Sequence, residues 1–170
     1  MLVRRERRSD WGAIGAVHAA AFAGDAGLPA EVALVDALRA NRTAIPALSL
    51  VAEARDGAVV GHVMCSRGQL DERPSLGLGP LGVLPLHQRS GIGAALMHAV
   101  LGAADALEAP EMFVLGDPRY YSRFGFTLAA PIGLLPSEPA WSEHFQVRRL
   151  AAWDPSARGT FRYAAAFGGV

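Results

Sequence analysis

The sequence has 170 residues, of which 51% are hydrophobic and 19% are charged. This length suits a single domain, and the apolar content is too high for a disordered chain. Sixteen basic residues balance sixteen acidic ones, and every basic residue is an arginine. A net charge of zero attracts neither nucleic acid nor a membrane surface, so we expect neither partner. The absence of lysine excludes Schiff-base chemistry and Walker-type phosphate loops.

The cysteine content and the N-terminal residues indicate where the protein works. Cys65 is the only cysteine, so the sequence allows no internal disulfide and no cysteine-based metal cluster. The arginine-rich N-terminus leads into an alanine-rich stretch interrupted by Gly12, Gly15 and His18, which is unlike a signal peptide or a spanning helix. We therefore expect a cytoplasmic protein with no metal.

Hydrophobic periodicity and turn residues divide the first half of the chain into helices and strands. In chain order we expect a strand over 2–5, a helix capped by Ser9 or Asp10, a loop around Gly24 to Leu28, a helix from Pro29 to Asn41, and strands over 49–54 and 58–65. The Asp56-Gly57 step between the last two runs is a strong hairpin signal, so these strands should pair antiparallel.

The second half begins with an apolar run whose glycines and prolines predict a bulge or a close approach by another backbone or a ligand. The expected elements are a loop over 71–74, this strand over 76–84, a helix from Gly91 to Leu107, a strand over 112–115, helical turns over 119–124 closed by Gly125, and strands over 126–128, 145–150 and 161–165. Strands that alternate with helices in this way are typical of a layered α/β domain.

A strand, a glycine turn and a helix follow one another over 81–96. The first N–H groups of such a helix lack internal partners and lie at the positive end of its dipole, so they form an anion site. Gly91 and Gly93 let a phosphate approach that backbone without an intervening side chain. A dinucleotide fingerprint would need a third glycine where Leu96 stands, and a nucleotide-triphosphate loop would need a lysine.

The remaining pattern is Gln/Arg-x-x-Gly-x-Gly/Ala, which matches residues 88–93. This turn resembles the pyrophosphate-binding motif of the GNAT superfamily of N-acetyltransferases. Gly61-His62-Val63 is similar to the family's third strand, and 120–126 is similar to its Tyr-x-x-φ-Gly-Phe ending. The resemblance covers roughly residues 1–130 and only weakly the tail after Pro131.

The resemblance implies one domain over 1–170, with its core in 1–130 and with C-terminal strands and acceptor-side loops in 131–170. It implies a mixed, mostly antiparallel, twisted sheet flanked by helices, with a splayed central strand that binds CoA. The implied function is transfer of an acetyl group from acetyl-CoA to a primary amine of a small molecule or peptide, by direct attack in a ternary complex. The alternative is a non-catalytic module that binds acyl-CoA. The apolar composition also leaves room for a homodimer interface.

The resemblance also assigns residues to the site. Leu81 and Val83 would hydrogen-bond the pantetheine and the carbonyl through their backbones. Tyr121 falls where relatives carry the general acid that protonates the coenzyme thiolate, and Tyr120 beside it is the alternative. The residues expected to bind the cofactor are Leu81, Gly82, Val83, Gln88, Arg89, Ser90, Gly91, Ile92, Gly93 and Ala94.

The general base is where the sequence departs from the family pattern. Several relatives carry a carboxylate near the start of the central strand, but residues 76–79 read Leu-Gly-Leu-Gly here. Glu53, His62 and Asp71 are the first candidates to replace it, and Glu72 and His87 are further ones, acting directly or through water.

Overall fold

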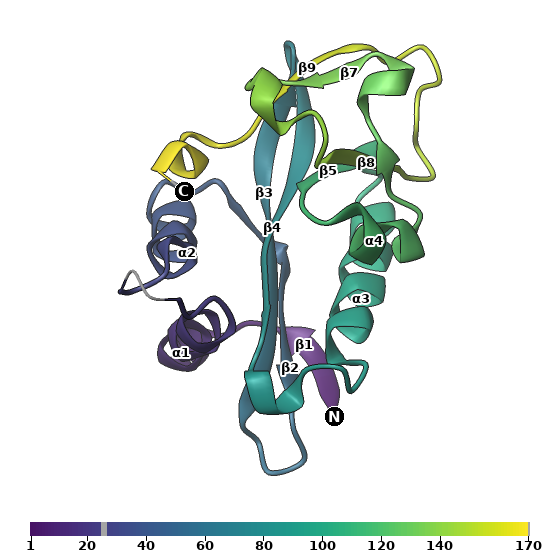
Figure 1. The fold of residues 1–170 in the computed structure, drawn as a ribbon. Helices are drawn as coiled ribbons and strands as arrows, with labels where there is room; N and C mark the ends of the chain where they lie inside the picture. Colours follow the sequence, from purple (N-terminus) through teal and green to yellow (C-terminus); the bar gives the residue numbers. More distant parts are fainter. Residues whose placement is uncertain (25–26, 170) are drawn as a thin grey trace.

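The computed structural model describes residues 1–24 and 27–169 of the chain (Figure 1). Residues 25 and 26, in the loop expected around Gly24 to Leu28, lie outside this description, as does residue 170. The helices are α1 (Trp11–Ala21), α2 (Ala30–Ala40), α3 (Ile92–Ala106) and α4 (Pro118–Tyr121). The strands are β1 (Leu2–Arg5), β2 (Ala44–Glu53), β3 (Val59–Leu70), β4 (Arg73–Val83), β5 (Glu111–Leu115), β6 (Thr127–Leu128), β7 (Leu134–Pro136), β8 (Phe145–Arg149) and β9 (Gly159–Arg162).

The strands form one mixed sheet in the order β1-β2-β3-β4-β5-β8-β6. Along this path β4 and β5 run parallel, and the other neighbouring strands are antiparallel. β9 lies off this path. It pairs antiparallel with residues 69–70 at the C-terminal end of β3, and parallel with β7. The expected mixed, mostly antiparallel sheet is therefore confirmed.

The sheet splits between β4 and β5. The two strands pair only where residues 76–78 lie beside 112–114, and β4 then continues to Val83 without β5. Val63 pairs with Leu81 and Cys65 with Leu78, so Gly79 and Pro80 together oppose one residue of β3. This is a β-bulge, as the glycine and proline content predicted, and a bulge bends a strand away from its neighbours. The bend coincides with the point at which β4 leaves β5.

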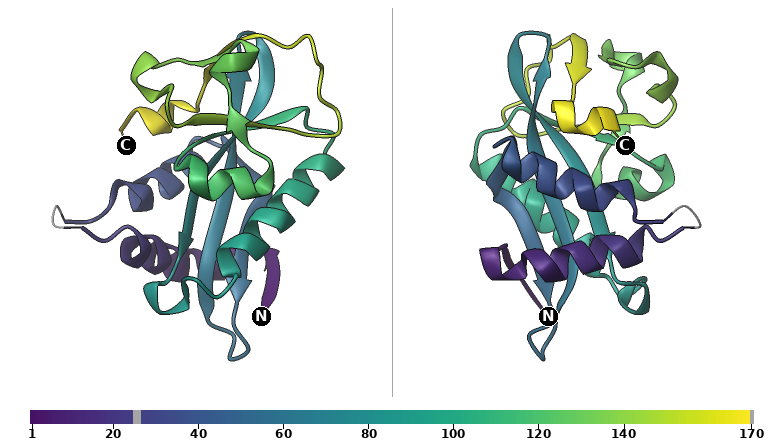
Figure 2. Two further views of the ribbon diagram at one scale, coloured as in Figure 1. Left: turned by 45° about the vertical axis from the view of Figure 1, so that its right-hand side comes forward. Right: turned by 90° about the vertical axis from the view of Figure 1, so that its left-hand side faces the viewer.

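Helices cover both faces of the sheet. Figure 2 shows α1 and α2 side by side on one face, while α3 packs on the other. The inner strands alternate accordingly, since successive side chains of a strand point to opposite faces. Val51 packs in the core under α1 and α2, whereas Leu50 and Ala52 pack in the core under α3. This alternation fixes the register that places β4 between the two helical layers.

A third core lies under the C-terminal strands. The ring of Phe113 on β5 stacks on Phe161 of β9, with centroids 4.2 Å apart, and on Phe145 of β8, with centroids 5.2 Å apart. The residues after Pro131 thus pack directly on the central strands. This packing brings the end of the chain next to the split in the sheet.

Several predicted boundaries differ from the structure. Residues 71–74 were expected to form a loop, but Arg73 and Pro74 already pair with Leu70 and Gln69, which leaves a two-residue turn. The strand expected over 161–165 lies at Gly159–Arg162, and a 3₁₀ turn begins at Ala165. The first difference reflects a hairpin that is tighter than its loop-forming residues suggest. Pairing with the distant strands β3 and β7 decides the position of β9, and local sequence patterns do not encode such pairing. No helix within 1–24 and 27–169 is long and apolar enough to span a membrane.

Candidate active site

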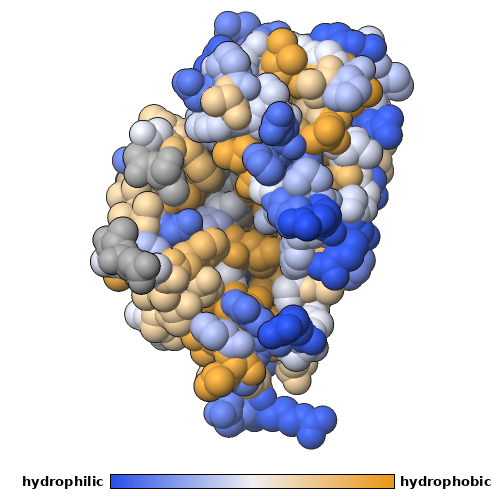
Figure 3. All heavy atoms as spheres, in the orientation of Figure 1, coloured by the Kyte–Doolittle hydropathy of each residue, from blue (hydrophilic) through white to orange (hydrophobic). Residues whose placement is uncertain are grey.

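A cleft of about 970 Å³ opens where β4 leaves β5. Figure 3 shows it as a hollow in the centre of the molecule, with apolar side chains exposed inside it. One side of the cleft is formed by the start of α3, the loop before it and α4. The opposite side is formed by the end of α1, the first turn of α2 and residues near the C-terminus. The split in the sheet therefore creates the site.

The free edge of β4 presents its backbone to this cleft. The N–H of Leu84 donates to the carbonyl oxygen of Val60 on β3, at 2.9 Å, and Gly82 pairs with His62. Because backbone groups alternate along a strand, those of Leu81 and Val83 point away from β3. The Val83 carbonyl indeed accepts a hydrogen bond from Nε2 of Gln88, at 3.1 Å. A ligand lying in the cleft can therefore pair with β4 as an added strand would.

The N-terminus of α3 lies on the same side. Gly91 caps the helix in the left-handed region, with φ 88°, and its carbonyl accepts the first helical hydrogen bond from the N–H of Ala95, at 2.9 Å. The N–H groups of 92–94 consequently have no partner within the helix. A Cβ added to Gly93 would lie 2.7 Å from the Tyr120 hydroxyl oxygen, so a larger residue would crowd the space between the start of α3 and Tyr120. The geometry suits an anion on the helix dipole.

Seven of the ten residues predicted to bind the cofactor line the cleft. They are Leu81, Val83, Gln88, Arg89, Gly91, Gly93 and Ala94. The other three do not line it, since Gly82 and Ile92 are buried and Ser90 is exposed outside it. Gly82 abuts His18 of α1, the hydroxyl of Ser90 donates to the carbonyl of His87, and the side chain of Ile92 is buried in the core.

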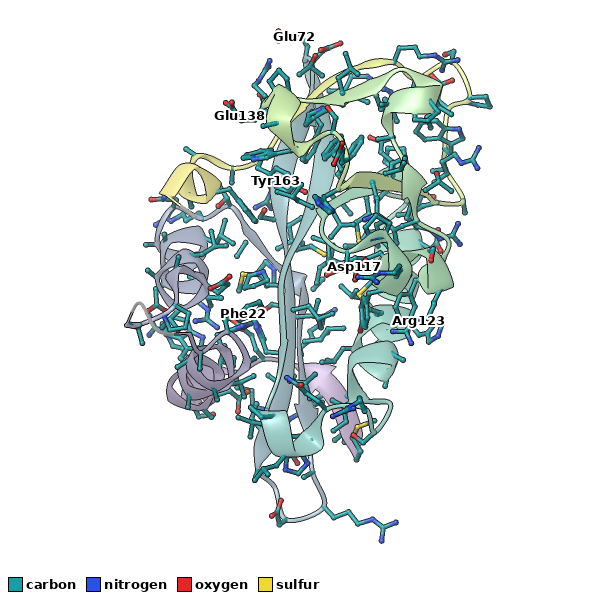
Figure 4. All side chains as sticks on the ribbon, viewed as in Figure 1. Phe22, Glu72, Asp117, Arg123, Glu138 and Tyr163 are labelled. Atoms are coloured by element: carbon teal, nitrogen blue, oxygen red, sulfur yellow. The ribbon has the colours of Figure 1, made fainter. Side chains whose placement is uncertain are left out.

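Three tyrosine side chains lie near the point where the sheet splits. Tyr120 and Tyr121 both line the cleft, and the ring of Tyr121 packs against Gly116 and edge-on to Phe126, at 5.7 Å between centroids. Burial raises the pKa of Tyr121 well above the ordinary value for tyrosine. Tyr163, which sequence reasoning missed, approaches from β9's side and lies against Gly77 (Figure 4). Burial raises its pKa as well.

The three first candidates for the general base lie outside the cleft. Glu53 pairs with Arg4, at 2.7 Å, at the β1 edge of the sheet. Asp71 sits in the turn between β3 and β4 and accepts a hydrogen bond from the N–H of Thr160, at 2.9 Å. His62 is fully buried beneath α1. The carboxylates that do line the cleft are Glu31 and Asp117.

His62 belongs to a buried polar network instead. Its Nδ1 lies 2.8 Å from Nε2 of His18, and its Nε2 lies 3.2 Å from Glu6 and 3.1 Å from the hydroxyl of Ser49. Arg39 of α2 pairs with the same Glu6 carboxylate, at 2.7 Å. Burial lowers the pKa of both histidines, that of His18 to about 3, so both rings are neutral near pH 7. The network thus links α1, through His18, and α2, through Arg39, to His62 on β3 of the sheet.

The opposite side of the cleft contains residues that the sequence did not reveal. They are Phe22, Glu31, Trp141, Tyr163 and Phe167. Phe22 follows directly on the last residue of α1. Glu31 reaches the cleft from the first turn of α2. Trp141, Tyr163 and Phe167 lie far from β4 in sequence and are brought to it with β9, whose pairing with β3 has no local signal in the sequence. Within 1–24 and 27–169, no group of three acidic, histidine or cysteine side chains is placed to hold a metal ion.

Comparison with known proteins identifies the class. Residues 46–128 match the family model described as the Acetyltransferase (GNAT) domain. The uncharacterized N-acetyltransferase YhbS of Escherichia coli (strain K12) is 34% identical over 153 residues, which cover 89% of this chain and 88% of the relative. The chain therefore belongs to the GNAT superfamily of N-acetyltransferases. The expected acetyl-CoA-dependent acyltransferase is confirmed at the level of the family.

Two solved structures resemble the whole chain. The crystal structure of YhbS from Escherichia coli in complex with CoA has a TM-score of 0.89 and 32% identity, covering 98% of this chain and 91% of that one. A GNAT family acetyltransferase from Brucella melitensis in complex with acetyl-CoA has a TM-score of 0.79 and 35% identity, covering 98% and 97%. These two likenesses extend through the C-terminal residues, which the sequence motifs covered only weakly.

Proposed function

We propose that this chain transfers the acetyl group of acetyl-CoA to a primary amine by direct attack in a ternary complex. One observation carries the proposal: the outward-facing backbone of Leu81 and Val83 and the free N–H groups at the start of α3 lie along the same cleft. An extended amide chain that ends in a pyrophosphate fits such a continuous track of hydrogen-bonding groups. Two relatives were crystallised with CoA or acetyl-CoA, which supports this ligand.

In the proposed complex, the pantetheine arm pairs with β4 and the pyrophosphate lies on the N–H groups of 92–94. Arg89 and Arg123 line this side of the cleft and add positive charge beside the phosphates. The thioester then lies near the split in the sheet, where Tyr121 stands. The acceptor amine enters from the side formed by α1, α2 and the C-terminal residues.

The proposed reaction moves one acetyl group and one net proton. The neutral amine nitrogen attacks the thioester carbonyl carbon, a C–N bond forms and the C–S bond breaks. Tyr121 donates its phenolic proton to the departing thiolate, the new amide nitrogen loses its extra proton to water, and solvent reprotonates the tyrosinate. Because burial raises the pKa of Tyr121, the phenol stays protonated near neutral pH and can act as this acid.

Two measurements on the full-length protein test the proposal. Calorimetry should show binding of acetyl-CoA, and release of free thiol from acetyl-CoA should depend on an added primary amine. Binding without thiol release across a broad panel of amines and peptides would favour the alternative, a module that binds acyl-CoA without turnover. Failure to bind either CoA or acetyl-CoA would refute both functions.

A further inference from the structure

One side of the cleft is an aromatic surface with a single carboxylate. We call Phe22, Glu31, Trp141, Tyr163 and Phe167 the acceptor wall, since all five line the cleft away from α3. The rings of Tyr163 and Phe167 lie 4.6 Å apart, and those of Trp141 and Tyr163 lie 6.2 Å apart. In Figure 4, Phe22 and Tyr163 flank β4, while Asp117 and Arg123 lie across the cleft. The wall is therefore a separate surface from the proposed cofactor side.

Charge is divided between the two sides of the cleft. Arg89 and Arg123 line the side of α3 and α4, and Glu31 lines the side of α2. Within the described parts of the chain, no cation forms an ion pair with Glu31. The other carboxylate of the cleft, Asp117, already accepts hydrogen bonds from Arg119, at 2.9 and 3.3 Å. Glu31 thus makes the acceptor wall attractive to a cation.

The wall also leaves apolar surface and one polar group for a ligand. Phe22 is 37% exposed although it stacks on His18, at 5.9 Å between centroids. The Tyr163 hydroxyl is buried near the backbone of Leu115 without reaching hydrogen-bond geometry to any described residue. A buried hydroxyl normally has a partner, and exposed aromatic faces at a cleft commonly bind apolar groups or cations.

Resting on the proposed function above, we propose that the acceptor is a small primary monoamine with an apolar or aromatic body. Its ammonium group is drawn by Glu31, and its body packs on the rings of the acceptor wall. The ammonium loses one proton to water, and the resulting neutral amine attacks the thioester. A polyamine or an aminoglycoside fits this surface poorly, because one carboxylate leaves their further charges desolvated and unpaired.

The test measures binding to the CoA-loaded protein, so that it does not require turnover. 2-Phenylethylamine, the neutral alcohol 2-phenylethanol and spermidine are titrated calorimetrically into the full-length protein saturated with CoA. We expect the monoamine to bind about tenfold more tightly than either comparison ligand, the effect of one well-placed charge pair. Glu31→Gln should bring the affinities for amine and alcohol within about twofold of each other.

Asp36→Asn is the matched control, since it removes an exposed carboxylate of the same helix that does not line the cleft. It should preserve the preference for the amine over the alcohol. Spermidine binding as tightly as the monoamine, an equal affinity for amine and alcohol, or no binding of the monoamine would each overturn this inference. A failure of the proposed function is distinguishable, because either CoA itself would not bind, or acetyl-CoA would bind without release of free thiol in the presence of any amine.

Discussion

The imidazole of His18 lies against Gly82, where a Cβ added to the glycine would be 2.8 Å from Nδ1 of the ring. The ring cannot retreat freely, since its Nε2 is bonded to His62, at 2.8 Å, and its face stacks on Phe22. This contact joins the cleft strand β4 to α1. It also explains why position 82 of β4 is a glycine, since the space between the strand and the His18 ring has no room for a side chain.

Gly82→Ala should therefore destabilise the protein, by about 1–3 kcal/mol, because the added methyl group overpacks a fully buried site. Thermal unfolding at pH 7.5 measures the effect as a lower Tm. Gly102→Ala is the comparison, since this exposed glycine of α3 has open space around its Cβ position. Alanine there should raise stability by about 0.5–1 kcal/mol. A Gly82→Ala protein as stable as the wild type would contradict the described contact.

The sequence revealed more of the cleft residues on the proposed cofactor side than on the proposed acceptor side. The glycine turn around Gly91 and Gly93 and the hairpin at Asp56-Gly57 depend on short-range conformational preferences, so local patterns revealed them. Trp141 and Tyr163 reach the cleft only through long-range strand pairing, which leaves no short-range pattern. The family resemblance could single out Tyr121, which lines the cleft, because the motif that contains it is a contiguous stretch of the sequence, residues 120–126.

The candidates for the general base show the same limit of prediction from sequence. Glu53, His62 and Asp71 were candidates by residue type, and the structure places each of them outside the lining of the cleft. The ion pair of Glu53 with Arg4 and the bond between His62 and His18 join residues 49 and 44 positions apart. Residue type alone therefore does not distinguish a structural partner from a catalytic one.

Ala94→Asp tests the anion site at the start of α3. Ala94 lines the cleft in the first turn of the helix, where a carboxylate favours the helix dipole and so preserves folding. The same charge would repel the pyrophosphate, and we expect about tenfold to hundredfold weaker binding of acetyl-CoA. Calorimetry at two salt concentrations should show a smaller loss at the higher one, because salt screens the repulsion.

His98→Asp is the control for Ala94→Asp. It places the same charge on an exposed position of α3 that does not line the cleft. Its affinity for acetyl-CoA should stay within about twofold of the wild type. Equal losses in the two variants would mean that net charge, and not the helix N-terminus, determines binding.

Tyr121→Phe tests the proposed general acid. With an amine that the enzyme acetylates, we expect kcat to fall about a hundredfold or more, because the thiolate loses its proton donor. The alkaline limb of the wild-type pH profile should lie above pH ~10, the ordinary pKa of tyrosine, because burial keeps this phenol protonated to higher pH. Pre-steady-state measurement of the acetyl-transfer step gives the rate to compare.

Tyr120→Phe decides between the two adjacent hydroxyls. Both side chains line the cleft, and their rings lie 5.0 Å apart. A hundredfold loss in Tyr120→Phe together with a rate close to wild type in Tyr121→Phe would transfer the role of acid to Tyr120. The fold assignment would be unaffected by that result.

The buried histidines should make the protein less stable in mild acid. Burial lowers the pKa of His18 to about 3 and also lowers that of His62, whereas an unfolded histidine titrates near 6.5. Below pH 6.5 the unfolded chain therefore binds protons that the folded chain does not, so stability falls as the pH decreases. Each imidazole that stays neutral contributes a loss of about 2 kcal/mol between pH 7 and pH 5.

Glu6 adds a second loss at lower pH. Burial opposes its charged form, but hydrogen bonds from His62, Arg39 and Ser49 outweigh burial and lower its pKa from 4.5 to about 2. Its contribution to stability is complete above pH 4.5 and is lost as the pH falls toward 2.

Tm measured from pH 7.5 to pH 4 tests both effects and should fall steadily. In His18→Gln, the decrease in Tm between pH 7.5 and pH 5 should be smaller than in the wild type. His144→Gln, which alters an exposed histidine, should leave the slope unchanged. An equal slope in the wild type and in His18→Gln would show that His18 is not held neutral by the fold.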